Sequence, residues 1–438
     1  MNPEHRDSRS GRKHLPRSQA SMMWNKLGRG TLASVLSLAL VSVTACSRDY
    51  VLAYVYVTTA KPLTSASRHG GISAYAVDYQ IGSLTPLADS PIEAGTNPVT
   101  LVASPNGLNL YVVNHDDATI GVYSIGTDGK IFLQSTVNTT GSNPTSIAID
   151  SAGKFLYVAF QYQLGPNGQQ LYSPASPGPG GVTIFPIGSA GALGSPSTVN
   201  VGNNPVGIVV SRPTPGTSTV FVYVLDQETL PKPATVLGFQ QNSSTGGLTP
   251  TPGTVITTDT TGKTVATGYG AGTTPSAIAE DPSARFVYIT DEATNQLYGN
   301  VVSNTGALVP MVNSPFATGI LPLGLTIDPR GQFLYVANYT SGSIGAYAIN
   351  TATGTPVGSV GSASTTVDTG PQCVTVEPAL GIYVYTANNL AGTVSALKLD
   401  PHNGGLGQVQ NTPFPSGALP TCAVSVANGS HPTQIIVD

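Results

Sequence analysis

Charged side chains are scarce in this chain, at 9% of its 438 residues. Beyond residue 45 the charge is acidic, with 11 basic and 20 acidic residues, and no cluster of Lys and Arg is present there. Binding to nucleic acid requires a basic surface that neutralises phosphates. The composition therefore excludes nucleic acid as an expected partner.

Tryptophan, cysteine and helical periodicity are also scarce. The chain has one Trp and three Cys, and no Cys-x-x-Cys, His-x-x-x-His or EF-hand spacing, so we predict no metal site of these types and no cofactor. No apolar pattern with a period of 3.6 residues continues past the N-terminal segment. The chain is instead rich in Gly (50) and Pro (35), with short runs of Val, Ile, Leu and Tyr, which is typical of an all-β protein with many turns.

The N-terminal segment has the pattern of an export signal. Basic residues precede an apolar run, residues 31–45, that is too short to span a membrane comfortably. The run ends in Val43-Thr44-Ala45-Cys46, which resembles the lipobox of bacterial lipoproteins. We therefore expect a signal peptide over 1–45, a lipidated Cys46 with a short linker over 46–53, and anchoring to a membrane of the cell envelope. Ser47 favours an outer-membrane lipoprotein facing the periplasm or the exterior; the alternative is an ordinary secretory signal.

One unit recurs seven times in the rest of the chain. Each copy contains Gly-x-x-Pro or a close variant, a short apolar strand, a turn and an aromatic strand of the form (Leu/Val)-Tyr-(Val/Ile/Thr). The aromatic strands are centred on Tyr56, Tyr111, Tyr157, Tyr223, Tyr288, Tyr335 and Tyr385, and the prolines are Pro98, Pro144, Pro205, Pro275, Pro322, Pro371 and Pro420. Repeats of this kind predict a closed array of similar units.

Two further strands follow in each unit, so the sequence predicts a seven-bladed β-propeller of four-stranded antiparallel blades over residues 54–438. The chain enters at a second strand, near Val55, and its last proline-marked strand runs from Thr421 to Ala427. One blade would then combine N-terminal and C-terminal strands, which closes the ring and hides its edges. We accordingly expect a monomer.

The repeat resembles that of the lactonase-like seven-bladed propellers, and Leu334-Tyr335-Val336-Ala337-Asn338 carries the clearest copy of their signature. Some members of this family open the ring of 6-phosphogluconolactone. The resemblance implies a site at the channel mouth, with His and Arg just after the proline of certain inner strands.

None of the seven residue pairs that follow these prolines contains His, Arg, Asp or Glu. The sequence therefore predicts a binding or scaffold protein without the usual catalytic residues. The alternative is a divergent sugar-lactone hydrolase, a carboxylic ester hydrolase of the lactonase type.

Four residues are candidates for chemistry because they lie on the loops that such a propeller gathers on one face. His115 stands beside Asp116, and Asp226 and Asp291 end aromatic strands. A His next to carboxylates suits acid–base catalysis or a divalent cation. A solvated polar turn is the simpler interpretation of the same residues.

Three residues are candidates for contact with a carbohydrate or protein ligand: His69, Tyr162 and Tyr172. The two tyrosines lie in a long loop, 161–181, and a second long loop, 251–274, is rich in Thr and Gly. Cys373 and Cys422 occupy equivalent positions in adjacent inner strands and are candidates for a disulfide, with two buried thiols as the alternative.

Overall fold

The computed structural model describes residues 51–61, 67–228, 232–359, 364–429 and 434–436. The predicted signal peptide and Cys46 lie outside these residues. Within them, no helix has the length and apolar character needed to cross a membrane. Val51–Asp438 forms one compact unit.

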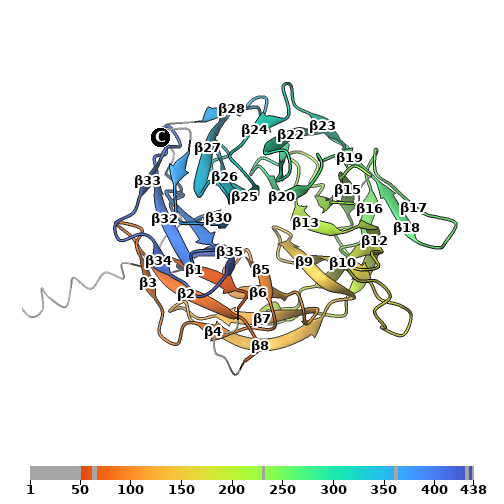
Figure 1. Cartoon of the computed structure of the whole chain (residues 1–438), viewed down its shortest axis with the longest axis horizontal. Coiled ribbons are helices and arrows are strands. Elements are labelled where there is room, and N and C mark those ends of the chain that lie inside the picture. Colours follow the sequence, from red (N-terminus) through yellow and green to blue (C-terminus); the bar gives the residue numbers. More distant parts are fainter. Residues whose placement is uncertain (1–50, 62–66, 229–231, 360–363, 430–433, 437–438) are drawn as a thin grey trace, which may run out of the picture. The chain divides into compact units, whose positions relative to one another are not determined.

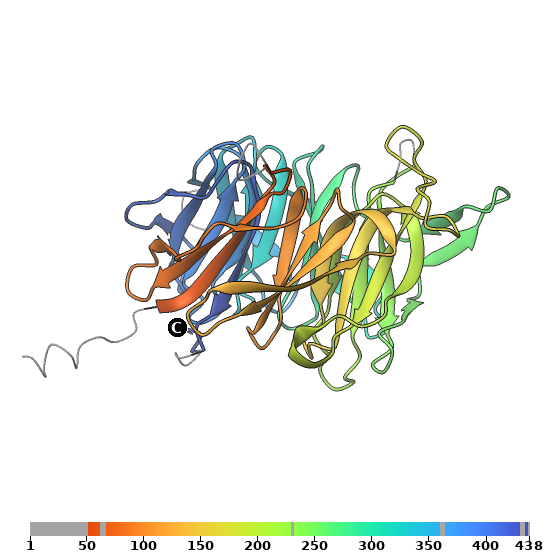
Figure 2. The same cartoon turned by 90° about the horizontal axis from the view of Figure 1, so that it is seen from below.

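Seven sheets stand around a central axis, and each is a wedge-like blade of four antiparallel strands (Figures 1 and 2). The predicted seven-bladed propeller is confirmed. The inner strands are β35 (Pro420–Ala427), β5 (Pro98–Ala103), β9 (Gly141–Ile149), β13 (Pro205–Val210), β20 (Pro275–Glu280), β25 (Pro322–Ile327) and β30 (Pro371–Val376). The second strands are β1 (Val51–Thr59), β6 (Asn109–Asn114), β10 (Phe155–Gln163), β14 (Phe221–Asp226), β21 (Phe286–Asp291), β26 (Phe333–Asn338) and β31 (Tyr383–Asn388).

The remaining strands complete the blades outward. The third strands are β2 (Gly71–Asp78), β7 (Thr119–Ile125), β11 (Pro179–Pro186), β15 (Thr235–Gln241), β22 (Gln296–Val302), β27 (Ser343–Ile349) and β32 (Thr393–Leu399). The outer strands are β3 (Leu84–Pro86), β8 (Ile131–Asn138), β12 (Ser197–Asn203), β16 (Leu248–Pro250), β23 (Leu308–Pro310), β28 (Pro356–Ser359) and β33 (Leu406–Gln408). Five blades add a short strand beside the third one: β4 (Ile92–Glu93), β19 (Tyr269–Gly270), β24 (Phe316–Ala317), β29 (Thr365–Thr366) and β34 (Phe414–Pro415).

The ring closes as the sequence predicts. The first blade has the order β3-β2-β1-β35, so its inner strand comes from the C-terminal end of the chain. β1 and β35 pair antiparallel over seven positions, with Tyr56 opposite Val424. Each blade thereby has a full set of strands, and the two ends of the array do not expose unpaired edges at the closing seam.

The repeated tyrosine joins each blade to the next. In all seven blades the second-strand Tyr is fully buried and donates its hydroxyl to a glycine carbonyl, over 2.5–3.0 Å. The acceptors are Gly129, Gly191, Gly246, Gly306, Gly354, Gly404 and Gly82, all with a positive φ in the turn before the outer strand. The last contact, Tyr385 to Gly82, crosses the closing seam. Burial raises the pKa of these phenols, that of Tyr111 to about 12, which keeps the hydroxyl a donor.

The Gly-x-x-Pro motif makes contacts within a blade, whereas the tyrosine makes contacts between blades. In the second blade Asn114, the last residue of β6, pairs with Pro98 and accepts a hydrogen bond from the Gly95 amide at 3.0 Å. Asn338 does the same for Gly319 at 3.1 Å. A Cβ on either glycine would collide with the Asn side chain, so the close approach requires glycine. In these two blades the motif thus fastens the chain that enters the blade to the end of that blade's second strand.

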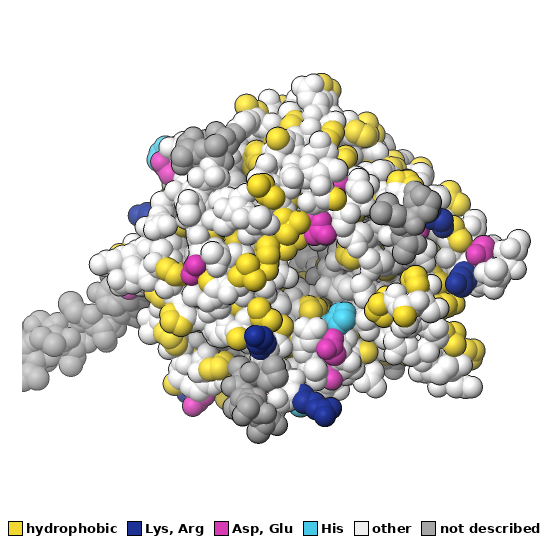
Figure 3. All heavy atoms as spheres, viewed as in Figure 1, with side chains coloured by type: hydrophobic (Ala, Val, Ile, Leu, Met, Phe, Trp, Pro, Cys, Tyr) yellow, Lys and Arg dark blue, Asp and Glu magenta, His cyan; other side chains and the backbone are white. Residues whose placement is uncertain are grey.

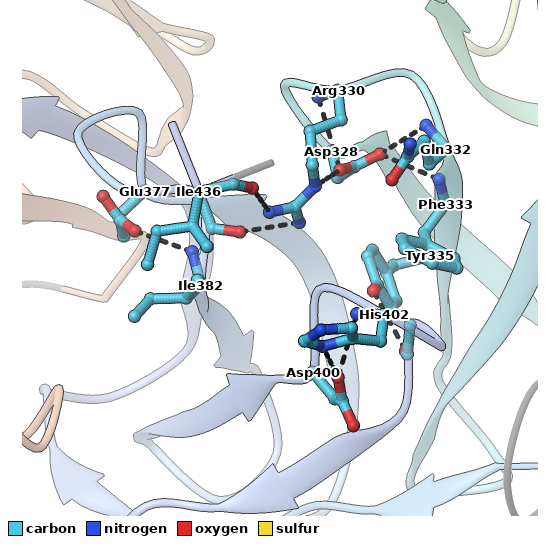
Figure 4. A network of polar contacts seen from close by, with 12 residues as sticks. Asp328, Arg330, Gln332, Phe333, Tyr335, Glu377, Ile382, Asp400, His402 and Ile436 are labelled. Carbon is cyan, nitrogen blue, oxygen red and sulfur yellow. Dashed lines mark hydrogen bonds and ion pairs between the residues drawn. The ribbon is translucent and has the colours of Figure 1, made fainter. Parts of the chain in front are cut away.

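A buried arginine holds the C-terminal segment (Figure 4). The Arg330 side chain is 1% exposed and contacts the Asp328 carboxylate at 2.6 Å. It also donates to the carbonyls of Gly381 (2.8 Å) and Ile436 (2.9 Å). Asp328 itself accepts the backbone amides of its own turn, as expected for an aspartate at the end of an inner strand.

Cys373 on β30 and Cys422 on β35 form a disulfide with their Cα atoms 4.9 Å apart. It connects the seventh blade to the closing strand.

The Thr- and Gly-rich loop 251–274 contains its own two-stranded sheet, β17 (Val255–Thr258) with β18 (Thr264–Thr267), besides β19. A short 3-10 turn, η1 (Ser189–Gly191), precedes β12.

Candidate functional site

A cavity of about 420 Å³ lies at the N-terminal ends of the inner strands, around the axis of the ring. Figure 3 shows a central hollow on the viewed face, with histidine and acidic side chains close to it. The two residues after each inner-strand proline line this cavity: Val99, Thr100, Thr145, Ser146, Val206, Gly207, Ser276, Ala277, Leu323, Gly324, Gln372, Cys373, Thr421 and Cys422. The cavity wall is therefore built by the repeat itself.

The wall is neutral over most of its area. Among the described residues that line it, Glu292 is the sole carboxylate, and none is Lys, Arg or His. The polar groups are the amides of Gln227 and Gln372 and several Ser and Thr hydroxyls. Such a wall offers hydrogen bonds to a polar ligand but no cation to hold a phosphate.

Of the described residues that line the cavity, Glu292 is the ionisable group placed for proton transfer. It directly follows β21 and is half-buried. Burial and the neighbouring Asp291 carboxylate raise the pKa of Glu292. A carboxyl whose pKa is moved toward neutrality is suited to act as a general acid or base.

Glu292 is one of a set of equivalent residues around the mouth. Each follows a second strand, and its backbone amide donates to the carbonyl of the residue before the inner-strand proline, over 2.7–3.1 Å. The set contains Ala60, His115, Gln227, Glu292, Tyr339 and Asn389. Five of the six have polar side chains, so the loops after the second strands supply ionisable groups, such as Glu292 and His115, that the residues after the inner-strand prolines lack.

Side-chain hydrogen bonds hold three members of this set, Gln227, Tyr339 and Asn389. Gln161 donates to Asn204 at 2.6 Å, and Asn204 donates to Gln227 at 2.7 Å. On the other side, Tyr339 donates to Asn389 at 3.3 Å. These contacts fix the orientation of the amides, which is what recognition of ligand hydroxyl groups requires.

His115 and Asp116 form a pair at the mouth. Nδ1 of His115 lies 2.6 Å from Asp116 Oδ1, which also accepts a bond from Asn97 at 3.0 Å. Burial acts to raise the pKa of Asp116, but the hydrogen bonds from His115 and Asn97 outweigh it and lower that pKa. The carboxylate therefore remains ionised and orients the imidazole ring. Neither residue lines the cavity.

Asp226 and Asp291 lie away from the cavity surface, because both side chains are fully buried at the ends of their strands. Asp291 accepts the backbone amides of Thr273, Thr274 and Ala293, which makes it a structural cap. Their sequence neighbours Gln227 and Glu292 line the cavity instead. The four sequence candidates therefore do not converge on one pocket.

The three proposed ligand contacts also lie outside the cavity wall. His69 is exposed and pairs with Glu93 at 2.7 Å. Tyr162 belongs to β10 and is 7% exposed, and the Tyr172 ring lies 5.4 Å from the Lys263 ammonium. Among the described residues, no group of three or more His, Cys, Asp or Glu is arranged to hold a metal ion.

Comparisons with known proteins agree with the seven-bladed fold. The chain matches the family described as lactonase, seven-bladed β-propeller, over residues 54–236 and 221–376. It is 24% identical to the 6-phosphogluconolactonase of Yersinia enterocolitica over 281 residues, which are 62% of this chain and 73% of that protein.

Two solved structures share the fold. A Bacteroides uniformis protein, provisionally assigned as a 6-phosphogluconolactonase, aligns with a TM-score of 0.65 at 18% identity, covering 86% of this chain and 99% of its own. The periplasmic gluconolactonase of Pseudomonas aeruginosa aligns with a TM-score of 0.62 at 20% identity, over 86% of this chain and 99% of its own. The chain belongs to the lactonase family of seven-bladed β-propellers.

Proposed function

We propose that this protein binds an uncharged polyhydroxylated ligand, a sugar or a sugar lactone, at the mouth of the propeller channel. The observation that carries the proposal is the cavity wall, where amides and hydroxyls stand around a single carboxylate. Oriented amides such as Gln227 pair with ligand hydroxyls, both as donors and as acceptors. A phosphosugar is disfavoured, because Glu292 would repel its phosphate and the lining residues supply no cation.

Calorimetry on the purified protein tests this proposal. We expect a neutral aldonolactone or its parent sugar to bind, and the 6-phosphorylated form to bind at least about tenfold more weakly, which corresponds to about 1.4 kcal/mol. Gln227→Ala removes one oriented amide of the wall and is expected to weaken binding, while Gln80→Ala, on an exposed turn, is the matched control. Tighter binding of the phosphorylated form would contradict the proposal.

A second function is supported by Glu292 alone. Its position in the cavity and its raised pKa favour hydrolysis of a neutral lactone, with the ionised carboxylate activating water and oriented amide groups stabilising the oxyanion. Turnover of gluconolactone above the spontaneous rate, lost in Glu292→Gln while the same ligand still binds, would establish the hydrolase. If the lactone binds but is not hydrolysed, the protein is a binding protein, as first proposed.

We also propose that the protein is a monomer exported and anchored through lipidated Cys46 to the outer membrane, in the cell envelope. The basic lead, the short apolar run and Val43-Thr44-Ala45-Cys46 support this proposal. Two or more acyl chains on one Cys give stable anchoring. Metabolic labelling with a fatty acid, lost in Cys46→Ala, tests the anchor, and membrane fractionation tests the location.

A further inference from the structure

The last residue of the second strand is Asn or Asp in five blades, and it pairs with the inner-strand proline in each. These residues are Asn114, Asp226, Asp291, Asn338 and Asn388. Asn114 is a neutral residue at this position, and both ends of its amide are hydrogen-bonded. Its oxygen accepts a bond from the Gly95 amide, and its nitrogen donates to Thr119, the cross-strand partner, at 3.1 Å. Asp291 is an ionisable residue at the same position, and four backbone amides donate to its carboxylate.

Asp226 has neither of these hydrogen-bonding arrangements. Its side chain is fully buried. Among the residues that the structure describes, its Oδ2 has no hydrogen-bond partner, and Oδ1 receives one long contact, from the Glu228 amide at 3.5 Å. A buried carboxylate without donors is far more costly than a buried amide such as Asn388, whose unpaired oxygen is neutral. This position therefore requires a proton or a cation, because the described residues supply too few donors for a buried carboxylate.

Two further oxygens beside Asp226 lack partners. Glu228 is 7% exposed; Asn203 donates to its Oε2 at 3.0 Å, but its Oε1 has no partner. Thr235 is 9% exposed, and its hydroxyl has no partner either. Within the described part of the chain, three buried oxygens, from two carboxylates and one hydroxyl, are thus left without a hydrogen-bond partner.

The geometry brings these oxygens together. A Cβ placed on Gly202 would overlap Asp226 Oδ2 and would lie 3.2 Å from Glu228 Oε1, so both oxygens face the same glycine. Thr235 is the cross-strand partner of Asp226. In the seventh blade the equivalent pair, Asn388 and Thr393, is in contact at 3.0 Å, which shows that side chains at these two positions face each other.

The charges agree with this picture. Burial and the Glu228 carboxylate raise the pKa of Asp226 well above its usual range, and the exposed Lys232 acts in the opposite direction as the weakest of the causes. Either a proton or a cation must offset two buried carboxylates. Carboxylate and hydroxyl oxygens are ligands that calcium accepts, with water completing its coordination.

We propose that Asp226, Glu228 and Thr235 form a calcium site at the start of the loop after β14. The inference is independent of the ligand proposed for the channel. The cation would hold the start of this loop against Gly202 of β12, the outer strand of the preceding blade. Gln227, which lies between the two carboxylates in the sequence, lines the cavity. Calcium would therefore also fix the orientation of one group at the channel mouth.

Calcium titration of chelator-treated protein tests the proposal. Isothermal calorimetry is expected to show one Ca²⁺ bound per chain, and calcium is expected to raise the midpoint of thermal unfolding. Asp226→Asn and Glu228→Gln are expected to abolish both effects. Asp226→Asn should still fold, because Asn occupies the equivalent position in three other blades and pairs there with the neighbouring loop or cross-strand hydroxyl.

Asp291→Asn is the matched control, since Asp291 holds the equivalent position in the next blade but is satisfied by backbone amides. It should leave calcium binding unchanged. The proposal is overturned if the wild type binds no Ca²⁺ at millimolar concentration, or if binding persists in Asp226→Asn. Stabilisation by Asp226→Asn together with a wild type insensitive to calcium would assign the pair to a shared proton instead, and would equally overturn it.

Discussion

Replacing Tyr385 by Phe removes the hydroxyl that crosses the closing seam of the ring. Tyr385 is fully buried and donates to the Gly82 carbonyl at 2.9 Å, and residues 82 and 385 meet because the first and last blades are neighbours. The substitution keeps the aromatic ring and its packing. Its cost is therefore the loss of one hydrogen bond and the burial of an unpaired carbonyl.

The magnitude follows from that change. A net hydrogen bond contributes about 0.5–1.5 kcal/mol, and a buried acceptor left unpaired costs about 1–3 kcal/mol. We expect Tyr385→Phe to lower the free energy of unfolding by about 1–3 kcal/mol, measured by equilibrium urea denaturation. Tyr335→Phe removes the same contact at an internal seam, to Gly404 at 3.0 Å, and should cost the same.

Tyr339→Phe is the control, because its half-buried hydroxyl contacts a side chain at the channel mouth and should change stability by less than about 0.5 kcal/mol. Equal costs at the closing and internal seams are expected for a closed ring of like blades. A neutral Tyr385→Phe beside a costly Tyr335→Phe would refute the reasoning, since it would mean that the closing seam is not formed.

Three further outcomes are expected. Arg330→Met removes the donors that hold the Ile436 carbonyl and leaves Asp328 without its cation; we expect a loss of about 3 kcal/mol in urea denaturation and faster digestion by carboxypeptidase. Cys422→Ser opens a crosslink between residues 49 apart and should cost about 2–4 kcal/mol, whereas the wild type in reductant should match the variant. In chelator, the raised pKa of Asp226 means that the folded state binds more protons than the unfolded one, so stability should fall as pH rises from about 4 toward that pKa. Asp226→Asn should remove this part of the pH dependence.

The sequence predicts the ring because its signals are local and repeated. The proline, the turn and the aromatic strand recur in every blade, and the half-repeats at the two ends predict closure. It does not show where the repeated tyrosine hydroxyl goes. Tyr111 and its acceptor Gly191 are 80 residues apart, so the contact depends on packing between blades and not on neighbours along the chain.

The functional groups of the site are harder to predict than the ring, because their positions depend on how the loops pack in space. Family resemblance directs attention to the residues after the prolines, and those do line the cavity. The groups with chemistry come from the loops, where a shift of one residue decides which side chain reaches the channel. Asp291 is buried and Glu292 lines the cavity. In the sequence they are two adjacent acidic residues, and nothing there distinguishes the buried one from the one in the cavity. Likewise the unpaired state of Asp226 is visible only when its neighbours in space are known.

A crystal structure of the protein soaked with a neutral aldonolactone tests the central claim most directly. We expect the ligand in the channel cavity, with its hydroxyls on Gln227, Glu292 and the hydroxyl groups of the inner strands. Ligand found on the outer face of the blades, or a cavity that stays empty while binding is measured in solution, would contradict the account.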